Sequence, residues 1–242
     1  MKIFVINLPD RTDRREYAES QLKNYNYTIY PAISVESQPE KYFKGIKKLS
    51  FLFETGRFLV KSEIACYASH LKVWKKCVAL DESIIVLEDD FYKTKHFDKA
   101  INYIKGHINH LGFIRLEPPD NQTIQSPPLQ IGEFSLHRLR RTPFLSTAYA
   151  ISPQTARSFV KHSEYFSAPV DHMVRKTWVH QKPLFLLKPA AAEPSKKFGT
   201  SIQGREKSFL RHLLVIPRFI YRNFCNQYAL FFDRHFEKVE EN

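Results

Sequence analysis

The chain has 242 residues, 43% of them apolar, which is enough to bury the core of one α/β domain with a small appendage. The formal net charge of +12 predicts an anionic partner: a nucleic acid, a phosphorylated substrate or an anionic membrane surface. Three cysteines without a C-x-x-C pair argue against a disulfide framework and a zinc knuckle, and the sequence has no glycine-rich phosphate loop.

In the first half of the chain, short apolar runs alternate with helical patterns. The run from Ile84 to Leu87 is typical of a buried strand, and apolar residues recur at helical spacing after Ser62. Ser62 is placed to cap that helix, whereas residues 35–60 predict an irregular excursion. The elements expected in chain order are strand 2–7, helix 11–23, strand 27–33, helix 63–80 and strand 83–87.

The second half continues this alternation. Ser152 followed by Pro153 is typical of a helix start, with a capping residue and a proline in the first turn. Strands that alternate with helices predict one layered α/β domain with a mostly parallel central sheet, ending near residue 201. The expected elements are helix 97–110, strand 113–116, a loop over 118–128, a strand or hairpin over 129–139, strand 146–151, and helices that begin at residues 153 and 169.

Three consecutive carboxylates, Glu88, Asp89 and Asp90, follow the clearest buried strand. Ligands bind at the carboxyl edge of open α/β sheets, and a hard cation such as Mg²⁺ or Mn²⁺ would relieve the repulsion among these side chains. With a nucleotide diphosphate bound, that ion would neutralise charge on the leaving group. The alternative is an acidic loop start with solvated side chains.

Residues that follow the first strand are expected at the same edge of the sheet. Arg11 and Arg14 come just after Asn7 and Leu8, and a guanidinium group is well suited to phosphate oxygens. The alternative is a charged first turn of a surface helix. On their own, these residues are weak evidence for a phosphate-binding site.

Two further groups of polar residues are candidates for the site. One group lies beside the apolar stripe of the predicted helix 63–80 and either lines a pocket or has only a structural role: Glu63, Cys66, Ser69 and His70. Asp171 follows Pro169 at a helix start, so its carboxylate either caps that helix or acts as the general base for an acceptor hydroxyl.

The C-terminal segment differs in character from the rest of the chain. Aromatic and aliphatic residues mingle with arginines from Arg205 to Val239, and residues 205–222 hold five basic residues against one acid. This pattern is typical of a basic amphipathic helix that lies in a membrane interface. A helix packed on the core with its arginines in solvent is the alternative, and Pro217 interrupts the pattern.

The sequence shows neither an export signal nor a membrane span. The N-terminal apolar stretch, Ile3 to Ile6, is too short for the core of a signal peptide. No later window reaches the roughly 18 apolar residues that a membrane-spanning helix needs. We therefore expect a cytoplasmic protein, with peripheral attachment to the inner face of the cytoplasmic membrane as an option.

Five motifs, taken together and in this order, resemble glycosyltransferase family 25, the lipooligosaccharide and collagen galactosyltransferase group. The resemblance covers residues 3 to about 175 and implies a nucleotide-diphospho-sugar transferase fold of GT-A type with a single Rossmann-like domain. The expected division is a catalytic domain over 1–204 and a tail over 205–242. The motifs are VINLPDRTDRR, SEIACYASHLKVW, IIVLEDD, TPFLSTAYAISPQTAR and PVDHM.

The resemblance also implies roles for individual residues. Ser62 stands where the family often has glycine, and Thr200-Ser201-Ile202 departs from a Ser-Asp-Ile motif. The implied roles are Asp171 as catalytic base, Asp90 and Glu88 as metal ligands, and Asn7, Leu8, Arg11, Arg14, Glu63, Ser69, His70, Glu88 and Asp89 at the donor.

The activity implied is a metal-dependent, inverting transfer of a hexose from a UDP-sugar to a lipooligosaccharide acceptor, with galactose as the favoured hexose. Mn²⁺ or Mg²⁺ is the expected cofactor. A metal-dependent phosphohydrolase is an alternative, although the histidines are scattered without paired ligand motifs. A nucleic-acid-binding protein is a third, although no recognisable motif carries a stripe of Lys and Arg.

Overall fold

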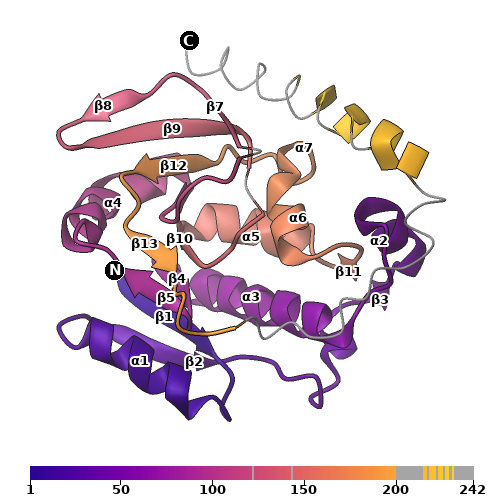
Figure 1. Cartoon of the computed structure of the whole chain (residues 1–242), viewed down its shortest axis with the longest axis horizontal. Coiled ribbons are helices and arrows are strands. Elements are labelled where there is room, and N and C mark those ends of the chain that lie inside the picture. Colours follow the sequence, from indigo (N-terminus) through magenta and orange to yellow (C-terminus); the bar gives the residue numbers. More distant parts are fainter. Residues whose placement is uncertain are drawn as a thin grey trace.

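The computed structural model describes residues 1–121, 123–142 and 144–199, together with residues 215, 216, 218–221, 223–225, 227, 228 and 231 of the tail. A nine-stranded sheet lies at the centre of this part of the chain, in the order β2-β1-β4-β10-β6-β12-β9-β7, with β8 paired to β9 (Figure 1). Its strands are β1 (Lys2–Asn7), β2 (Tyr27–Pro31), β4 (Ile84–Glu88), β6 (Phe113–Arg115), β7 (Ile124–Gln125), β8 (Leu129–Ile131), β9 (Phe134–Arg141), β10 (Ala148–Ile151) and β12 (Phe185–Lys188).

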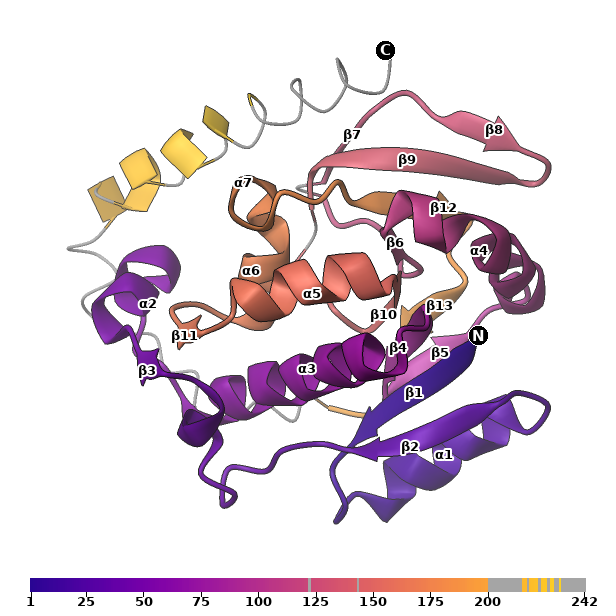
Figure 2. The same cartoon turned by 180° about the vertical axis from the view of Figure 1, so that it is seen from behind.

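Helices cover both faces of the sheet. Figure 2 shows α3 and α5 side by side on one face, where they contact each other. The helices are α1 (Thr12–Leu22), the 3-10 helix η1 (Pro39–Tyr42), α2 (Lys48–Thr55), α3 (Lys61–Leu80), α4 (Phe97–Leu111), α5 (Pro153–Lys161), α6 (Val170–Arg175) and α7 (Thr177–His180). Two small strand pairs flank the main sheet: β3 (Gly45–Ile46) with β11 (Tyr165–Phe166), and β5 (Phe91–Lys93) with β13 (Ala192–Pro194).

Alternate side chains of the central strands pack into two cores. In β1, Phe4 and Ile6 join the core that holds the apolar stripe of α3, whereas Ile3 and Val5 join the core that holds α1 and α4. The strand period of two therefore places one core on each face of the sheet.

The expected mostly parallel sheet is wrong, because the sheet is mixed. β1 pairs in parallel with β2 and β4, and β12 with β6, but β10 runs antiparallel to both β4 and β6. A parallel strand needs a crossover, usually a helix, whereas the described chain between β6 and β10 contains only strands and loops. The chain therefore enters β10 at the edge where β4 ends.

Most of the expected elements are present with boundaries shifted by a few residues. Ser152 caps α5 as predicted, since its Oγ accepts a hydrogen bond from the backbone N–H of Thr155. The cap expected at Ser62 is wrong: α3 begins at Lys61, and Val60 occupies the N-cap position without a side-chain bond. Residues 35–60, expected to be irregular, contain η1, β3 and α2.

None of the described helices is both long and apolar enough to cross a membrane. The domain boundary expected after residue 204 and the motif at 200–202 lie outside the described residues.

Candidate functional site

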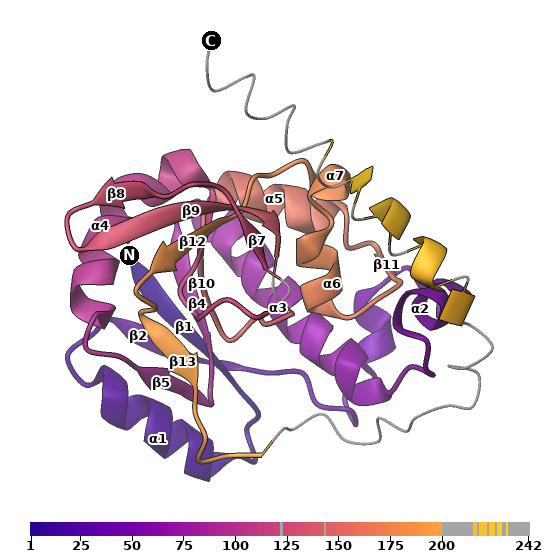
Figure 3. The same cartoon turned by 45° about the horizontal axis from the view of Figure 1, so that its top comes forward.

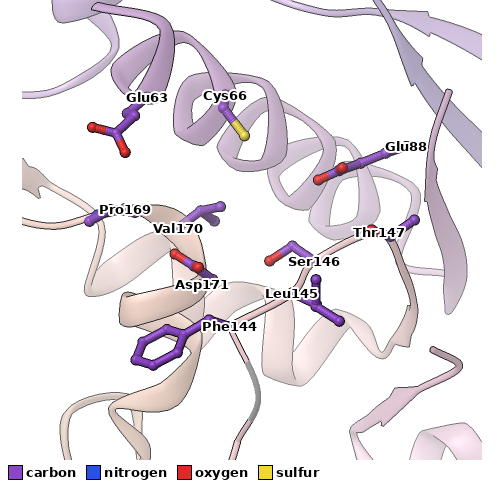
Figure 4. A pocket seen from close by; sticks show the side chains of 10 residues that line it. All are labelled: Glu63, Cys66, Glu88, Phe144, Leu145, Ser146, Thr147, Pro169, Val170 and Asp171. Carbon is purple, nitrogen blue, oxygen red and sulfur yellow. The ribbon is translucent and has the colours of Figure 1, made fainter. Parts of the chain in front are cut away.

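A pocket of about 190 Å³ lies where the end of β4 meets the first turns of α3 and α6 (Figure 4). Three carboxylates line it, each from a different element: Glu63 of α3, Glu88 of β4 and Asp171 of α6. Like charges in one cavity disfavour ionisation unless a cation or hydrogen-bond donors offset them. The remaining lining residues are Cys66, Phe144, Leu145, Ser146, Thr147, Pro169 and Val170.

Glu88 is held in place by a chain of hydrogen bonds that begins in the core. The indole Nε1–H of Trp74 donates to Tyr149 Oη at 2.9 Å, and that hydroxyl lies 2.9 Å from His70 Nδ1. The other imidazole nitrogen, Nε2, lies 3.2 Å from Glu88 Oε1. The indole can only donate and the Glu88 carboxylate can only accept, so every group has a partner when the Tyr149 hydroxyl donates to Nδ1 and the Nε2–H of His70 donates to Glu88.

This chain of hydrogen bonds makes a stability prediction. Tyr149→Phe would remove the acceptor of the buried Trp74 N–H, and we expect the free energy of unfolding to fall by about 1–3 kcal/mol. Tyr149 is 2% exposed, so water cannot replace the hydroxyl. Urea unfolding measures the change. Tyr92→Phe, at a side chain that is 53% exposed, is the control and is expected to leave stability unchanged; equal stability of both variants would contradict the described bonds.

Asp89 lies within a buried ion pair. Its Oδ1 accepts from Arg14 Nη1 at 2.9 Å and its Oδ2 accepts from Asn7 Nδ2 at 2.8 Å. Burial raises the pKa of Asp89, and the bonds from Arg14 and Asn7 oppose that shift. The structure thus brings Asn7 and Arg14 to the acidic motif, where they join β1, α1 and the end of β4 without lining the pocket.

Asp90 has one carboxylate oxygen that is unsatisfied within the described residues. Its Oδ2 lies 3.4 Å from Arg14 Nη1, whereas its Oδ1 is buried and has no hydrogen-bond partner there. Burial, followed by the charge of Glu88, raises the pKa of Asp90 to about 6. An orphaned carboxylate oxygen beside a second carboxylate fits a hard divalent cation.

A second set of ligand atoms lies close by but is less suited to a metal. Single ligand atoms of Cys66, His70 and Glu88 lie within 4.8 Å of one another. The proton that the hydrogen bonds place on His70 Nε2 occupies the position a metal would need. Glu88, which lines the pocket, and Asp90, which does not, are therefore the two residues that would hold a metal.

Asp171 is the second residue of α6, and Pro169 is its N-cap. The interpretation of Asp171 as the helix cap is wrong, because no side-chain hydrogen bond from the described residues caps this helix, and Asp171 Oδ1 accepts from the adjacent N–H of His172 at 2.9 Å. Figure 4 shows its carboxylate among the pocket-lining side chains. A carboxylate in this position can accept a proton from a hydroxyl in the pocket.

Two residues of the α3 motif serve the local fold. Glu63, although it lines the pocket, is 2% exposed and forms an ion pair with the two terminal guanidinium nitrogens, Nη1 and Nη2, of Arg57. Ser69 Oγ accepts from the backbone N–H of Ile33 at 2.8 Å and donates to the carbonyl of Ala65. Ser69 therefore joins α3 to the segment after β2.

Leu8 and Arg11 lie in the turn after β1 and do not line the pocket. Arg11 binds Asp13 on the surface, with Nε–Oδ1 and Nη2–Oδ2 distances of 3.0 and 2.8 Å. The hydrogen bond from Arg11 lowers the pKa of Asp13 to about 2. A ligand that uses the Arg11 guanidinium would compete with this pair.

Two residues of this region, Ser146 and Glu117, were not predicted from the sequence. Ser146 lines the pocket, and its Oγ is buried without a hydrogen-bond partner among the described residues. Glu117 is fully buried beside Arg115, accepts from the Ala148 N–H, and has its pKa raised to about 7 by burial. The position of Glu117 two residues after β6, at the edge where β4 ends, is a signal that could have been used.

Comparison with known proteins identifies the family. The model of "Glycosyltransferase family 25 (LPS biosynthesis protein)" matches residues 1–174. A putative glycosyltransferase of Acanthamoeba polyphaga mimivirus is 33% identical over 111 residues, which are 43% of this chain and 33% of that protein. A glycosyltransferase 25 family member of Aedes aegypti is 26% identical over 117 residues, which are 46% of this chain and 19% of the relative.

These relatives are longer than the region they share with the chain. A third, a glycosyltransferase 25 family member of Drosophila pseudoobscura pseudoobscura, is 27% identical over 39% of this chain and 16% of its own length. The family model covers all five motifs noted in the sequence and most of the chain. The resemblance is thereby confirmed: the chain belongs to glycosyltransferase family 25.

Proposed function

We propose that the chain is a metal-dependent, inverting glycosyltransferase of GT-A type. It would move a hexose, with galactose as the favoured candidate, from a UDP-sugar to a lipooligosaccharide acceptor. Family membership supports glycosyl transfer, and the description of the family as LPS biosynthesis proteins supports a lipopolysaccharide-type acceptor. The observation that carries the proposal is the pocket itself, which joins Asp171 to the acidic end of β4.

Glu88 and Asp90 are the residues that would hold Mn²⁺ or Mg²⁺. The orphaned Oδ1 of Asp90 and the raised pKa of its carboxyl group support this assignment. When bound, the ion supplies charge neutralisation for the departing diphosphate. His70 contacts the Glu88 carboxylate at Oε1, so that this ligand is oriented before any ion binds.

Asp171 is proposed as the general base. The acceptor hydroxyl donates its hydrogen bond to the Asp171 carboxylate and loses its proton to it as the hydroxyl oxygen attacks the anomeric carbon. The bond from that carbon to the diphosphate oxygen breaks, and UDP leaves with the electron pair. A single displacement on the face opposite the leaving group inverts the anomeric configuration.

Other predicted donor contacts have a structural role as well. Asn7 and Arg14 are engaged by Asp89, and Ser69 by the backbone, so we propose that these three shape the donor site through the fold. Ser146, whose Oγ has no partner among the described residues, is a better candidate for direct contact with a sugar hydroxyl. Arg11 remains proposed for a phosphate, at the cost of its surface pair with Asp13.

Thermal unfolding with UDP-sugars and Mn²⁺ tests the donor class. A ligand at about one hundred times its Kd stabilises the folded state by about 2.7 kcal/mol, which raises the Tm of a chain of this size by roughly 5–10 °C. We expect this shift with UDP-galactose plus Mn²⁺, and a much smaller one with either alone. GDP-mannose with Mn²⁺ is the control. Equal shifts for both sugar nucleotides, or no dependence on Mn²⁺, would contradict the proposed donor site.

A further inference from the structure

We propose that α2 and the C-terminal tail together form a surface that docks on an anionic lipid bilayer. Apolar side chains are exposed on both segments. Leu49 and Phe53 of α2 are 72% and 44% exposed, and Phe58, shortly after α2, is 63% exposed. The lipid-facing surface, as we name it, consists of Leu49, Phe53, Phe58, Val215, Ile216, Phe219, Ile220, Phe224 and Phe231.

The two segments lie at the same end of the molecule. The Arg218 guanidinium group of the tail packs against Gly56, the residue that ends α2 with a φ of +70°. Tyr228 of the tail contacts Trp178 of α7 edge to face, with ring centroids 6.3 Å apart. Figures 1 and 3 show the described tail residues beside α2 and α7. Among the described tail residues, Arg218 and Tyr228 therefore contact the core, while Val215, Ile216, Phe219, Ile220, Phe224 and Phe231 are exposed.

Positive charge accompanies the apolar side chains of α2. Lys47 and Lys48 stand just before and at the start of α2, whereas Lys44 is paired with Glu164. In the sequence, residues 205–222 contain five basic residues and one acid. Lys47 Nζ lies 4.6 Å from the ring of Tyr165, which is itself 44% exposed. Exposed aromatic and aliphatic side chains with a basic surround are typical of a segment that lies in the interface of an anionic membrane. This charge favours a lipid surface over a second copy of the chain, which has the same positive charge.

The inner side of α2 is joined to α6 and to Lys176 after it. Glu54 lies on α2 with its side chain 9% exposed, and its carboxylate accepts from His172 Nδ1 at 2.9 Å and from Lys176 Nζ. His172 follows Asp171 directly in α6. The lipid-facing surface thus connects through one buried carboxylate to the helix that carries the proposed base. Docking itself requires neither donor nor acceptor, so it can be tested apart from the proposed activity.

Flotation of the full chain with vesicles tests the docking. We expect binding to vesicles of phosphatidylcholine mixed with phosphatidylglycerol, little binding to phosphatidylcholine alone, and weaker binding at high salt because exposed charges are screened. Leu49→Ser with Phe53→Ser in α2, and Ile216→Ser with Phe219→Ser in the tail, are each expected to lower the partition coefficient at least about tenfold through lost apolar burial.

Leu129→Ser is the matched control. Leu129 is 63% exposed on β8, at the opposite end of the molecule from α2, and its replacement is expected to leave partitioning unchanged (Figure 1). Because all five side chains are exposed, Tm should stay the same in every variant. Full vesicle binding by both double variants would overturn the proposal. It would also be overturned if sedimentation showed a dimer that either double variant dissolves, because a second copy would then cover this surface.

Discussion

Asp171→Asn is expected to lower kcat for sugar transfer by about 10²- to 10⁴-fold, the usual contribution of a positioned general base. Asparagine keeps the size of the side chain and an oxygen that can accept from the His172 N–H, but it cannot take up the proton of an acceptor hydroxyl. The KM for the donor should change little, because the proposed donor contacts lie elsewhere. UDP release under saturating donor and acceptor measures the effect.

Asp81→Asn is the control for the loss of one carboxylate. Asp81 follows the last residue of α3, about 27 Å from Glu63 along the helix axis at 1.5 Å per residue. Its side chain is 73% exposed and pairs with Arg157. Its conformation is left-handed, with a φ of 51°, which asparagine tolerates. Normal turnover is expected for Asp81→Asn. Normal turnover in Asp171→Asn as well would show that Asp171 is not the general base.

The split within the acidic triplet could have been predicted from the period of the strand. In β4, Ile84 and Val86 face the core under α3, while Ile85 and Leu87 face the core under α1 and α4. Continuing this alternation places Glu88 on the α3 side and Asp89 on the α1 side. The structure has this arrangement: Glu88 meets His70 of α3, and Asp89 meets Arg14 of α1.

Other features depend on tertiary contacts that the sequence pattern does not carry. Residues 144–147 form a wall of the pocket only because β10 inserts antiparallel between β4 and β6. An apolar run such as that of Ala148–Ile151 has the same pattern in either direction, so its direction could not be predicted. α2 was missed for a related reason, since exposed Leu49 and Phe53 disturb the usual division between apolar and polar faces.

Helix starts were predicted correctly where a capping side chain was followed by a residue whose backbone also favours the first helical turn. Ser152 and Pro153 together favour a helix start, and α5 begins there. At Ser62 the capping side chain was the only signal for a helix start. The predicted helix begins at residue 63, whereas α3 begins at Lys61, and Glu63 in its first turn is paired with Arg57. The resemblance to family 25 suggested candidate site residues, and the geometry separates Asn7 and Arg14, which hold Asp89, from the residues that line the pocket.

Asp90→Asn is expected to weaken Mn²⁺ binding in the presence of UDP and to lower kcat/KM by about 10²- to 10³-fold, since a metal supplies several kcal/mol of charge stabilisation in such a reaction. The substitution neutralises the carboxylate whose buried Oδ1 has no partner in the described structure, and it leaves Glu88 as the remaining proposed ligand. Electron paramagnetic resonance of free Mn²⁺ measures affinity, and initial rates measure kcat/KM.

Asp10→Asn separates ligation from a general loss of negative charge. Asp10 is exposed in the turn after β1, at the same edge of the sheet, and its replacement should leave Mn²⁺ affinity unchanged. A pH series adds a second test: burial and the charge of Glu88 raise the pKa of Asp90 to about 6, so protons compete with the cation. Mn²⁺ affinity should therefore fall as the pH drops through 6 in the unmodified protein, and this dependence should be reduced in Asp90→Asn. Equal affinity of both proteins at every pH would place the cation elsewhere, and the acidic end of β4 would then have only a structural role through Asp89 and Arg14.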